Sequence, residues 1–339
     1  MVGDLINFSP CLKIIKDNKK DSHITLVCSE YNYQIAKNYY YVDKFIIFKK
    51  NKIFTNIFSN LKTLFFTNYK YLFQFDGNKS SYYISYFIHS KIRSTICFVK
   101  YKKIFGIDLQ IFRPLKIFLR LFYTNYLYCD ERYEEDYKKK SPVHYQTNYF
   151  NILKQLNFNI TDRKNLFFLD KSYENKYNYF FNNFINSPFN LFHFDEKWNS
   201  YKLVDFENAL KIIYYKSKKN KLIITTGLKD FLFFDKIKNK YTVFNFINDE
   251  FIQENINKNN VLVLRNLPLN LLAYFIKNSD INLSSHSGPV VHISPTFDRQ
   301  IIDLIPKSKN EELDRWIPAV SKYKRINFED LNDEIIENI

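Results

Sequence analysis

Two glycines that stand at or shortly after the ends of apolar runs are the residues best placed for chemistry in this chain. Gly227 comes straight after Leu222–Thr226, and Gly288 stands between Ser287 and Pro289, shortly after a second apolar run. Glycine lets the backbone approach a ligand closely, and ligands of α/β proteins bind at the carboxyl ends of strands. Because the chain has only five glycines, these two positions predict a binding site at strand ends. The competing interpretation of Ser287-Gly288-Pro289 is a plain turn that caps a helix.

Histidine and cysteine spacings give no sign of a metal site. His286 and His292 are six residues apart, which is a poor spacing for two ligands on one helix face. The four cysteines include no Cys-x-x-Cys pair, a pattern typical of a reduced cytosolic chain. We therefore expect no metal and no other cofactor.

Composition and charge limit the class of protein and its partners. With 339 residues, of which 46% are hydrophobic, the chain is long enough for two globular domains. Its apolar runs are short and broken by Lys or Asn, so we expect no signal peptide and no membrane-spanning helix. A net charge of +15 suits anionic lipids or phosphorylated substrates. No recognised nucleic-acid-binding module accompanies the charge, which disfavours nucleic acid. We expect a cytoplasmic protein, either free or peripheral on the inner face of the cytoplasmic membrane.

The elements that would position these residues alternate in type along the chain, as in repeated βαβ units. The sequence predicts an amino-terminal domain over residues 1–160, an irregular connection over 161–188 and a carboxy-terminal domain over 189–339, with the two α/β domains facing a central cleft. The expected strands are residues 23–28, 44–48, 71–75, 95–99, 190–194, 221–226, 242–246, 261–264, 280–284 and 300–305. The expected helices are residues 33–38, 53–66, 80–90, 141–156, 205–216, 231–238, 268–277, 288–296 and 327–339.

A colinear series of segments resembles the motifs of one enzyme family. The segments are residues 3–12 (GDLINFSPCL), 71–80 (YLFQFDGNKS), 193–198 (HFDEKW), 223–227 (IITTG), 280–289 (DINLSSHSGP), 301–305 (IIDLI) and 315–318 (RWIP). In this order they resemble the bacterial heptosyltransferases, family 9 of the glycosyltransferases. The resemblance implies a GT-B fold, with two Rossmann-like domains. It also implies transfer of a sugar, with inversion, from a nucleotide-diphosphate sugar to lipopolysaccharide or another membrane-borne cell-envelope glycan.

The resemblance also implies roles for single residues. Asp4 matches the carboxylate that takes the proton from the acceptor hydroxyl; the alternative is that Asp4 caps a helix beginning near Leu5. Lys197, with Lys202 as its rival, would give a point charge to the departing diphosphate. The implied donor-binding residues are Lys197, Thr226, Gly227, His286, Ser287, Gly288 and Pro289.

The chain departs from the family at two places. The family has a strand ahead of the Gly-Asp pair, and only two residues precede Gly3 here. Two alternatives follow: either the recorded start is short, or the first sheet lacks its central strand. His286 stands where the family usually has Asp, which argues against heptose as the donor sugar. The alternative function is therefore a catalytically degenerate member that binds a glycan or a partner without turnover.

Overall fold

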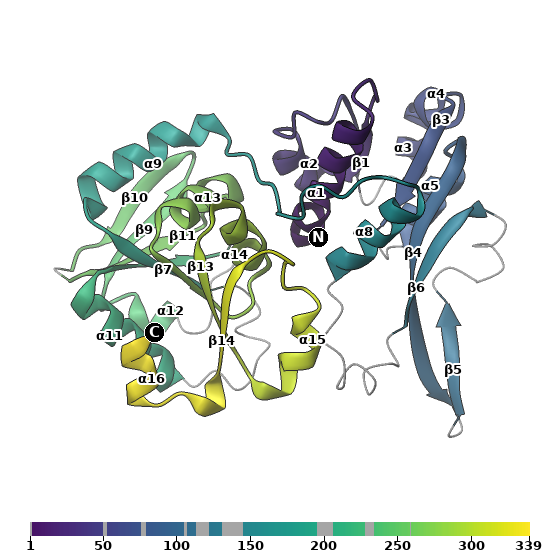
Figure 1. The fold of residues 1–339 in the computed structure, drawn as a ribbon. Coiled ribbons are helices and arrows are strands. Elements are labelled where there is room, and N and C mark those ends of the chain that lie inside the picture. Colours follow the sequence, from purple (N-terminus) through teal and green to yellow (C-terminus); the bar gives the residue numbers. More distant parts are fainter. Residues whose placement is uncertain are drawn as a thin grey trace. The chain divides into compact units, whose positions relative to one another are not determined.

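The structure is a computed structural model that describes residues 2–49, 53–75, 79–104, 107–112, 122–130, 145–194, 206–227, 234–257 and 259–339. The chain divides into two units, Gly3–Arg163 and Lys164–Ile339. Each unit contains both helices and strands (Figure 1). The α/β class predicted from the alternating pattern is therefore confirmed.

The described strands of the amino-terminal unit form two sheets. One sheet joins β1 (Thr25–Ser29) and β2 (Lys44–Phe48) in parallel. In the other, β4 is parallel to β3 and β6 and antiparallel to β5. These four strands are β3 (Tyr69–Gln74), β4 (Ser90–Ile104), β5 (Ile107–Phe112) and β6 (Asn125–Asp130). The helices of the unit are α1 (Val2–Asn18), α2 (Glu30–Ala36), α3 (Ile53–Ser59), α4 (Leu61–Phe65), α5 (Lys79–Tyr86) and α8 (Tyr145–Gln155).

Helix α1 begins at Val2, so Gly3 and Asp4 lie in its first turn. The alternative interpretation, that Asp4 caps a helix beginning near Leu5, is therefore wrong, because Asp4 lies within the helix. A carboxylate in the first turn still interacts favourably with the helix dipole. The helix also tolerates an internal proline, Pro10, because Ser9 Oγ donates a 2.6 Å hydrogen bond to the carbonyl of Ile6. That carbonyl is the one that proline, having no N–H, leaves without its usual partner.

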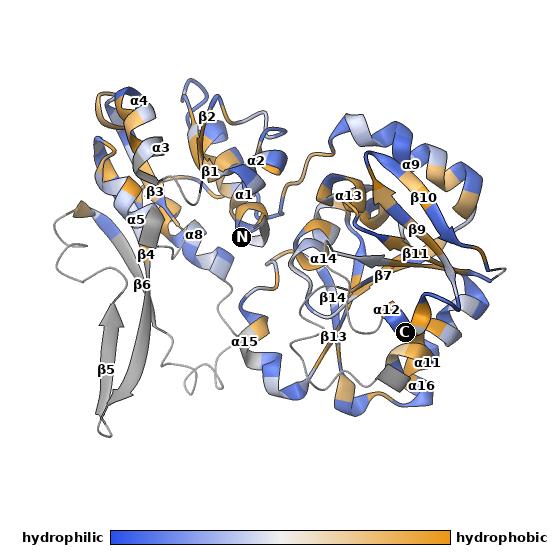
Figure 2. Ribbon diagram, turned by 180° about the vertical axis from the view of Figure 1, so that it is seen from behind, coloured by the Kyte–Doolittle hydropathy of each residue, from blue (hydrophilic) through white to orange (hydrophobic). Residues whose placement is uncertain are grey.

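The strands of the carboxy-terminal unit form one sheet in the order β10-β9-β11-β8-β7-β12-β13-β14. Neighbouring strands are parallel, except that β10 is antiparallel to β9. The strands are β7 (Phe189–Phe194), β8 (Lys221–Thr226), β9 (Thr242–Ile247), β10 (Glu250–Asn255), β11 (Val261–Arg265), β12 (Ile281–Ser284), β13 (Gln300–Ile305) and β14 (Lys322–Asn327). Strands covered on both faces are apolar along their whole length, and the middle of this sheet has mostly apolar colours (Figure 2).

Helices cover both faces of this sheet (Figure 1). One core cluster joins the strands to side chains of α11, α12 and α16, while α9, α13 and α14 lie on the other face. The helices are α9 (Glu174–Phe180), α11 (Phe206–Lys219), α12 (Phe234–Ile237), α13 (Leu269–Asn278), α14 (Gly288–Ile293), α15 (Asn310–Asp314) and α16 (Asp333–Asn338). None of the helices in the described ranges combines the length and apolarity needed to cross a bilayer.

The connection expected to be irregular over residues 161–188 is irregular only in part. Residues 171–185 form a continuous helical stretch that includes α9 and ends in a π-helical turn. The Phe180 ring lies 4.9 Å from Phe244, and Tyr177 stacks on Tyr274 at 5.7 Å. Tyr179, in contrast, is 62% exposed. The prediction was wrong because aromatic residues on both faces of α9 hide the helical period.

Candidate functional site

The carboxy-terminal sheet has a switch point between β7 and β12. From β7 the chain passes through α11 to β8 on one side, and β12 and the strands after it lie on the other side. Ligands of open α/β sheets bind beyond the carboxyl ends of strands at such a point. Ser284 ends β12 and pairs with His193 of β7. The topology therefore makes the segment after Ser284 the candidate site.

Asp303, fully buried in β13, holds this segment. Its carboxylate accepts hydrogen bonds from Ser284 Oγ at 3.1 Å, from His286 Nδ1 at 2.6 Å and from the Tyr323 hydroxyl at 2.7 Å. It also accepts one from the backbone N–H of His286. Because a carboxylate can only accept, Nδ1 of His286 carries the proton in this arrangement. Burial and the Asp303 carboxylate both raise the pKa of Tyr323, so its hydroxyl remains a donor.

His286 adopts an uncommon backbone conformation. Its φ is 54°, in the left-handed region that non-glycine residues seldom occupy. The two hydrogen bonds to Asp303 hold it there, and its side chain is 3% exposed. Backbone held in a sparsely populated conformation by its surroundings often marks a functional site.

Two buried hydroxyls lie beside His286 in the chain. Ser285 and Ser287 are both fully buried, and among the residues that the structure describes their Oγ atoms have no hydrogen-bond partner. Buried polar atoms are normally hydrogen-bonded, so these hydroxyls are suited to contact a polar ligand. Ser287 is the N-cap of α14, and Pro289 lies in the first turn of that helix.

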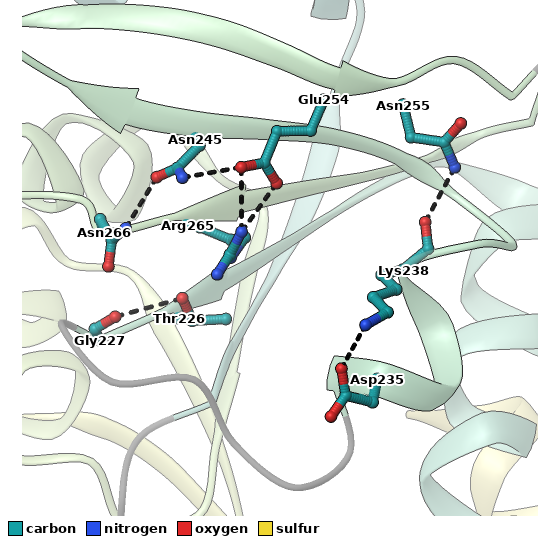
Figure 3. A network of polar contacts seen from close by, with 9 residues as sticks. All are labelled: Thr226, Gly227, Asp235, Lys238, Asn245, Glu254, Asn255, Arg265 and Asn266. Atoms are coloured by element: carbon teal, nitrogen blue, oxygen red, sulfur yellow. Dashed lines mark hydrogen bonds and ion pairs between the residues drawn. The ribbon is translucent and has the colours of Figure 1, made fainter.

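Both glycines singled out from the sequence border open space. A Cβ added to Gly227 or to Gly288 would meet no atom of the described residues within 4 Å. Gly227 follows β8, where its N–H donates to the carbonyl of Phe194 at 3.3 Å, and Thr226 Oγ1 donates to the Gly227 carbonyl at 3.2 Å (Figure 3). The ends of β8 and β12 lie on either side of β7. The structure thus brings Thr226 and Gly227 to the same sheet edge as the segment after Ser284.

The remaining predicted residues lie elsewhere. Lys197 and its rival Lys202 fall outside the described residues. Asp4 is in the amino-terminal unit, where it helps to line a pocket of about 640 Å³ together with Phe8 and Leu12 of α1 and residues of β1 and β3. The roles of Asp4 and Lys197 stay predictions.

A second polar cluster at this sheet edge was not foreseen (Figure 3). Arg265 Nη1 lies 3.0 and 2.8 Å from the two carboxylate oxygens of Glu254. Asn245 donates to Glu254 at 2.8 Å, and Asn266 donates to Asn245 at 2.7 Å. The Arg265 guanidinium also lies 4.3 Å from the ring centroid of Phe234. These contacts join the carboxyl ends of β9 and β11 to the edge strand β10.

Replacing Glu254 by glutamine is expected to lower the free energy of unfolding by about 1–2 kcal/mol, because a half-buried charged pair loses one charge. Urea titration would measure it. Glu250→Gln, at an exposed position on the same strand, is the matched control and should change stability by less than about 0.5 kcal/mol. Equal effects of the two substitutions would show that the Arg265 pair contributes nothing.

Asp303 and Tyr323 are the functional candidates that sequence reasoning missed. The available signal was a single charge inside the apolar run Ile301–Ile305, since a buried charge is costly unless it is paired. Among the described residues, no group of three or more His, Cys, Asp or Glu side chains could hold a metal ion.

Solved structures similar to this one include three glycosyltransferases. A family 9 glycosyl transferase from Veillonella parvula matches with a TM-score of 0.71 and 16% identity, covering 100% of this chain and 87% of that one. The E. coli heptosyltransferase WaaC with ADP matches with a TM-score of 0.65 and 13% identity, covering 100% and 95%. E. coli ADP-heptose lps heptosyltransferase II matches with a TM-score of 0.63 and 13% identity, covering 99% and 94%.

No protein-family model and no curated protein sequence matches the chain. At 13–16% identity the structural likeness defines the fold. The chain is thus an α/β protein with the GT-B fold of the family 9 glycosyltransferases. The resemblance to the heptosyltransferases drawn from the sequence is confirmed at the level of the fold.

Proposed function

We propose that the chain is an inverting glycosyltransferase that transfers a sugar from a nucleotide-diphosphate sugar to a lipopolysaccharide or another cell-envelope glycan. The observation that best supports the proposal is the segment Ser284–Gly288, which Asp303 holds at the switch point. Two of its buried hydroxyls have no hydrogen-bond partner within the described part of the chain. The fold supports it too, because the chain spans nearly the full length of heptosyltransferases, one of them solved with ADP.

Neutral hydrogen-bond donors and a positive charge would together hold the diphosphate of the nucleotide sugar. The hydroxyls of Ser285 and Ser287 and the backbone N–H groups at the start of α14 would donate to its oxygens. Lys197 would add a positive charge where negative charge develops on the leaving group. His286, held by Asp303, would contact the donor sugar or its phosphate, and we propose a donor sugar other than heptose. No metal takes part in this proposal.

The chemical step needs one base. The acceptor hydroxyl attacks the anomeric carbon from the face opposite the diphosphate, and Asp4 takes the hydroxyl proton. The bond between the anomeric carbon and the diphosphate oxygen breaks, and the diphosphate leaves with the bonding electrons. The configuration at the anomeric carbon is therefore inverted.

The acceptor is proposed to be a glycolipid borne by the membrane, with the enzyme on the cytoplasmic side. The net charge of +15 favours a surface of anionic lipids. The largely apolar pocket that Asp4 helps to line in the amino-terminal unit is suited to part of such an acceptor.

Ser287→Ala tests donor binding, because it should weaken nucleotide binding without lowering the stability of the protein. The substitution is expected to weaken ADP or UDP binding about 3–10-fold, measured by calorimetry, because one hydrogen bond to the ligand is lost. The unliganded protein should be as stable as the wild type or more stable, because an unpartnered buried hydroxyl is removed.

Ser279→Ala is the matched control for this test. The Ser279 hydroxyl is equally buried but bonds the carbonyl of Ile276 at 3.0 Å and Asn282 Oδ1 at 2.9 Å. Its loss should lower stability and leave nucleotide affinity unchanged. If neither nucleotide binds the wild-type protein, the proposed function is wrong. Nucleotide binding without release of nucleoside diphosphate from a nucleotide sugar, when envelope acceptors are supplied, would favour the degenerate binding protein.

A further inference from the structure

Positive charge is concentrated in one part of the amino-terminal unit. Between Lys44 and Ile104 the sequence has eleven lysines and Arg93 but a single acidic residue, Asp76. The whole chain carries a net charge of +15, so most of its excess charge belongs to this segment. The segment includes α3, α4, β3 and α5, which lie together in both ribbon views (Figures 1 and 2).

Four phenylalanines are exposed on the same part of the unit. Their exposed fractions are 72% for Phe58, 52% for Phe65, 72% for Phe66 and 41% for Phe87. Scattered exposed apolar residues are ordinary, but a contiguous group of large ones marks an interaction surface. Unlike tyrosine, phenylalanine has no polar group that would favour exposure to water.

Three of these phenylalanines are chain neighbours of residues in one small buried cluster. Phe58 follows Ile57, Phe65 follows Leu64, and Phe87 precedes Ile88, while Phe66 is the next residue after Phe65. The N–H of His89 donates to the carbonyl of Leu64 at 3.2 Å, which joins the end of α4 to the turn before β4. The rings of Phe65 and Phe66 lie 5.4 Å apart.

Three exposed lysines lie within four positions of these phenylalanines in the chain. Lys62 lies on α4 between Phe58 and Phe65, and Lys70 and Lys91 are the second residues of the adjacent parallel strands β3 and β4. The register pairs Tyr69 with Ser90 and Tyr71 with Ile92, so the two lysines lie side by side. We call these four phenylalanines and three lysines the aromatic–basic surface.

We propose that the aromatic–basic surface docks the amino-terminal unit on an anionic lipid membrane. The phenyl rings enter the boundary between headgroups and acyl chains, where each removes apolar area from water. The lysines stay at headgroup depth, where each contributes about 1 kcal/mol of attraction to an anionic surface, or roughly fivefold in affinity. Nucleic acid also binds basic surfaces, but apolar rings that stand in solvent without a polar edge favour the lipid. The inference extends the proposed transfer to a membrane-borne acceptor.

Vesicle flotation of the full chain tests the surface. We expect binding to vesicles of equal parts phosphatidylglycerol and phosphatidylcholine, at least tenfold weaker binding to phosphatidylcholine alone, and weakening as salt rises. The double variant Phe65→Ser, Phe66→Ser should lose at least tenfold in affinity for the anionic vesicles. The triple variant Lys62→Ala, Lys70→Ala, Lys91→Ala should lose more, by roughly fivefold for each lysine.

Tyr214→Ser is the matched control in the other unit. Tyr214 is 56% exposed on α11, and the Lys218 ammonium lies 4.2 Å from its ring centroid. This variant should bind anionic vesicles as the wild type does. Thermal unfolding of every variant checks that folding is unchanged, which the exposure of the substituted rings predicts.

Three results would overturn the proposal. The first is wild-type vesicle binding in the double phenylalanine variant, and the second is an equal loss in Tyr214→Ser. The third is competition by single-stranded RNA that depends on the lysines but not on the phenylalanines, which would indicate a nucleic-acid surface. No donor or acceptor is present in these measurements. Sugar transfer to a detergent-soluble acceptor without vesicle binding would therefore refute this surface and leave the proposed function intact.

Discussion

Replacing Asp303 by alanine is expected to lower the free energy of unfolding by about 3–5 kcal/mol and to abolish measurable nucleotide binding. Removal of the carboxylate leaves buried donors of Ser284, His286 and Tyr323 without their acceptor. Unpaired buried donors cost far more than the hydrogen bonds themselves contribute. The backbone of His286, with its φ of 54°, also loses both bonds that hold it. Urea unfolding and calorimetry with ADP and UDP measure the two effects.

Asp303→Asn separates the structural part of this effect from the functional part. Asparagine has nearly the same volume as aspartate, but its NH₂ group cannot accept the hydrogen bond that Nδ1–H of His286 donates. We expect partial recovery of stability but at least tenfold weaker nucleotide binding than in the wild type, because the imidazole tautomer changes. Asp280→Ala, an exposed position just before β12, should affect neither quantity. A fully stable Asp303→Ala variant that still binds nucleotide would refute the role given to Asp303.

Replacing Asp4 by asparagine is expected to lower turnover by about 10²–10⁴-fold. The amide cannot take the proton of the acceptor hydroxyl, although its size and position are the same. Nucleotide affinity should not change, since the residues proposed to bind the donor belong to the carboxy-terminal unit. The measurement is release of nucleoside diphosphate with an envelope acceptor, alongside calorimetry of donor binding.

The stability of the same Asp4→Asn variant measures the structural role of Asp4. Loss of its charge from the first turn of α1 should cost about 0.3–1 kcal/mol through the helix dipole. Asp17→Asn, at the other end of α1 where Asp17 pairs with Lys13 at 2.6 Å, is the control and should retain full turnover. Wild-type turnover in Asp4→Asn would leave only the structural role and favour the degenerate binding protein.

The buried strands were the most predictable elements of the fold. Strands β2, β8 and β13 have the bounds that their apolar runs predicted. Strands β10 and β14 were missed because half-exposed edge strands, such as Glu250–Asn255, carry charged residues instead of an apolar run. The helix expected over residues 53–66 is divided at Asn60, where the backbone leaves the helical conformation.

The sequence by itself determined the α/β class, the GT-B resemblance and the presence of a glycine-containing segment after a buried strand. These features depend on residues close together in the chain, where hydrophobic periodicity and glycine position act directly. Only the tertiary structure decided that Asp303 holds His286. The two residues lie 17 positions apart, and they meet because β12 and β13 pair in a parallel register that aligns Ser284 with Asp303. The register of a sheet follows from the packing of all its strands, so no local pattern could reveal that contact.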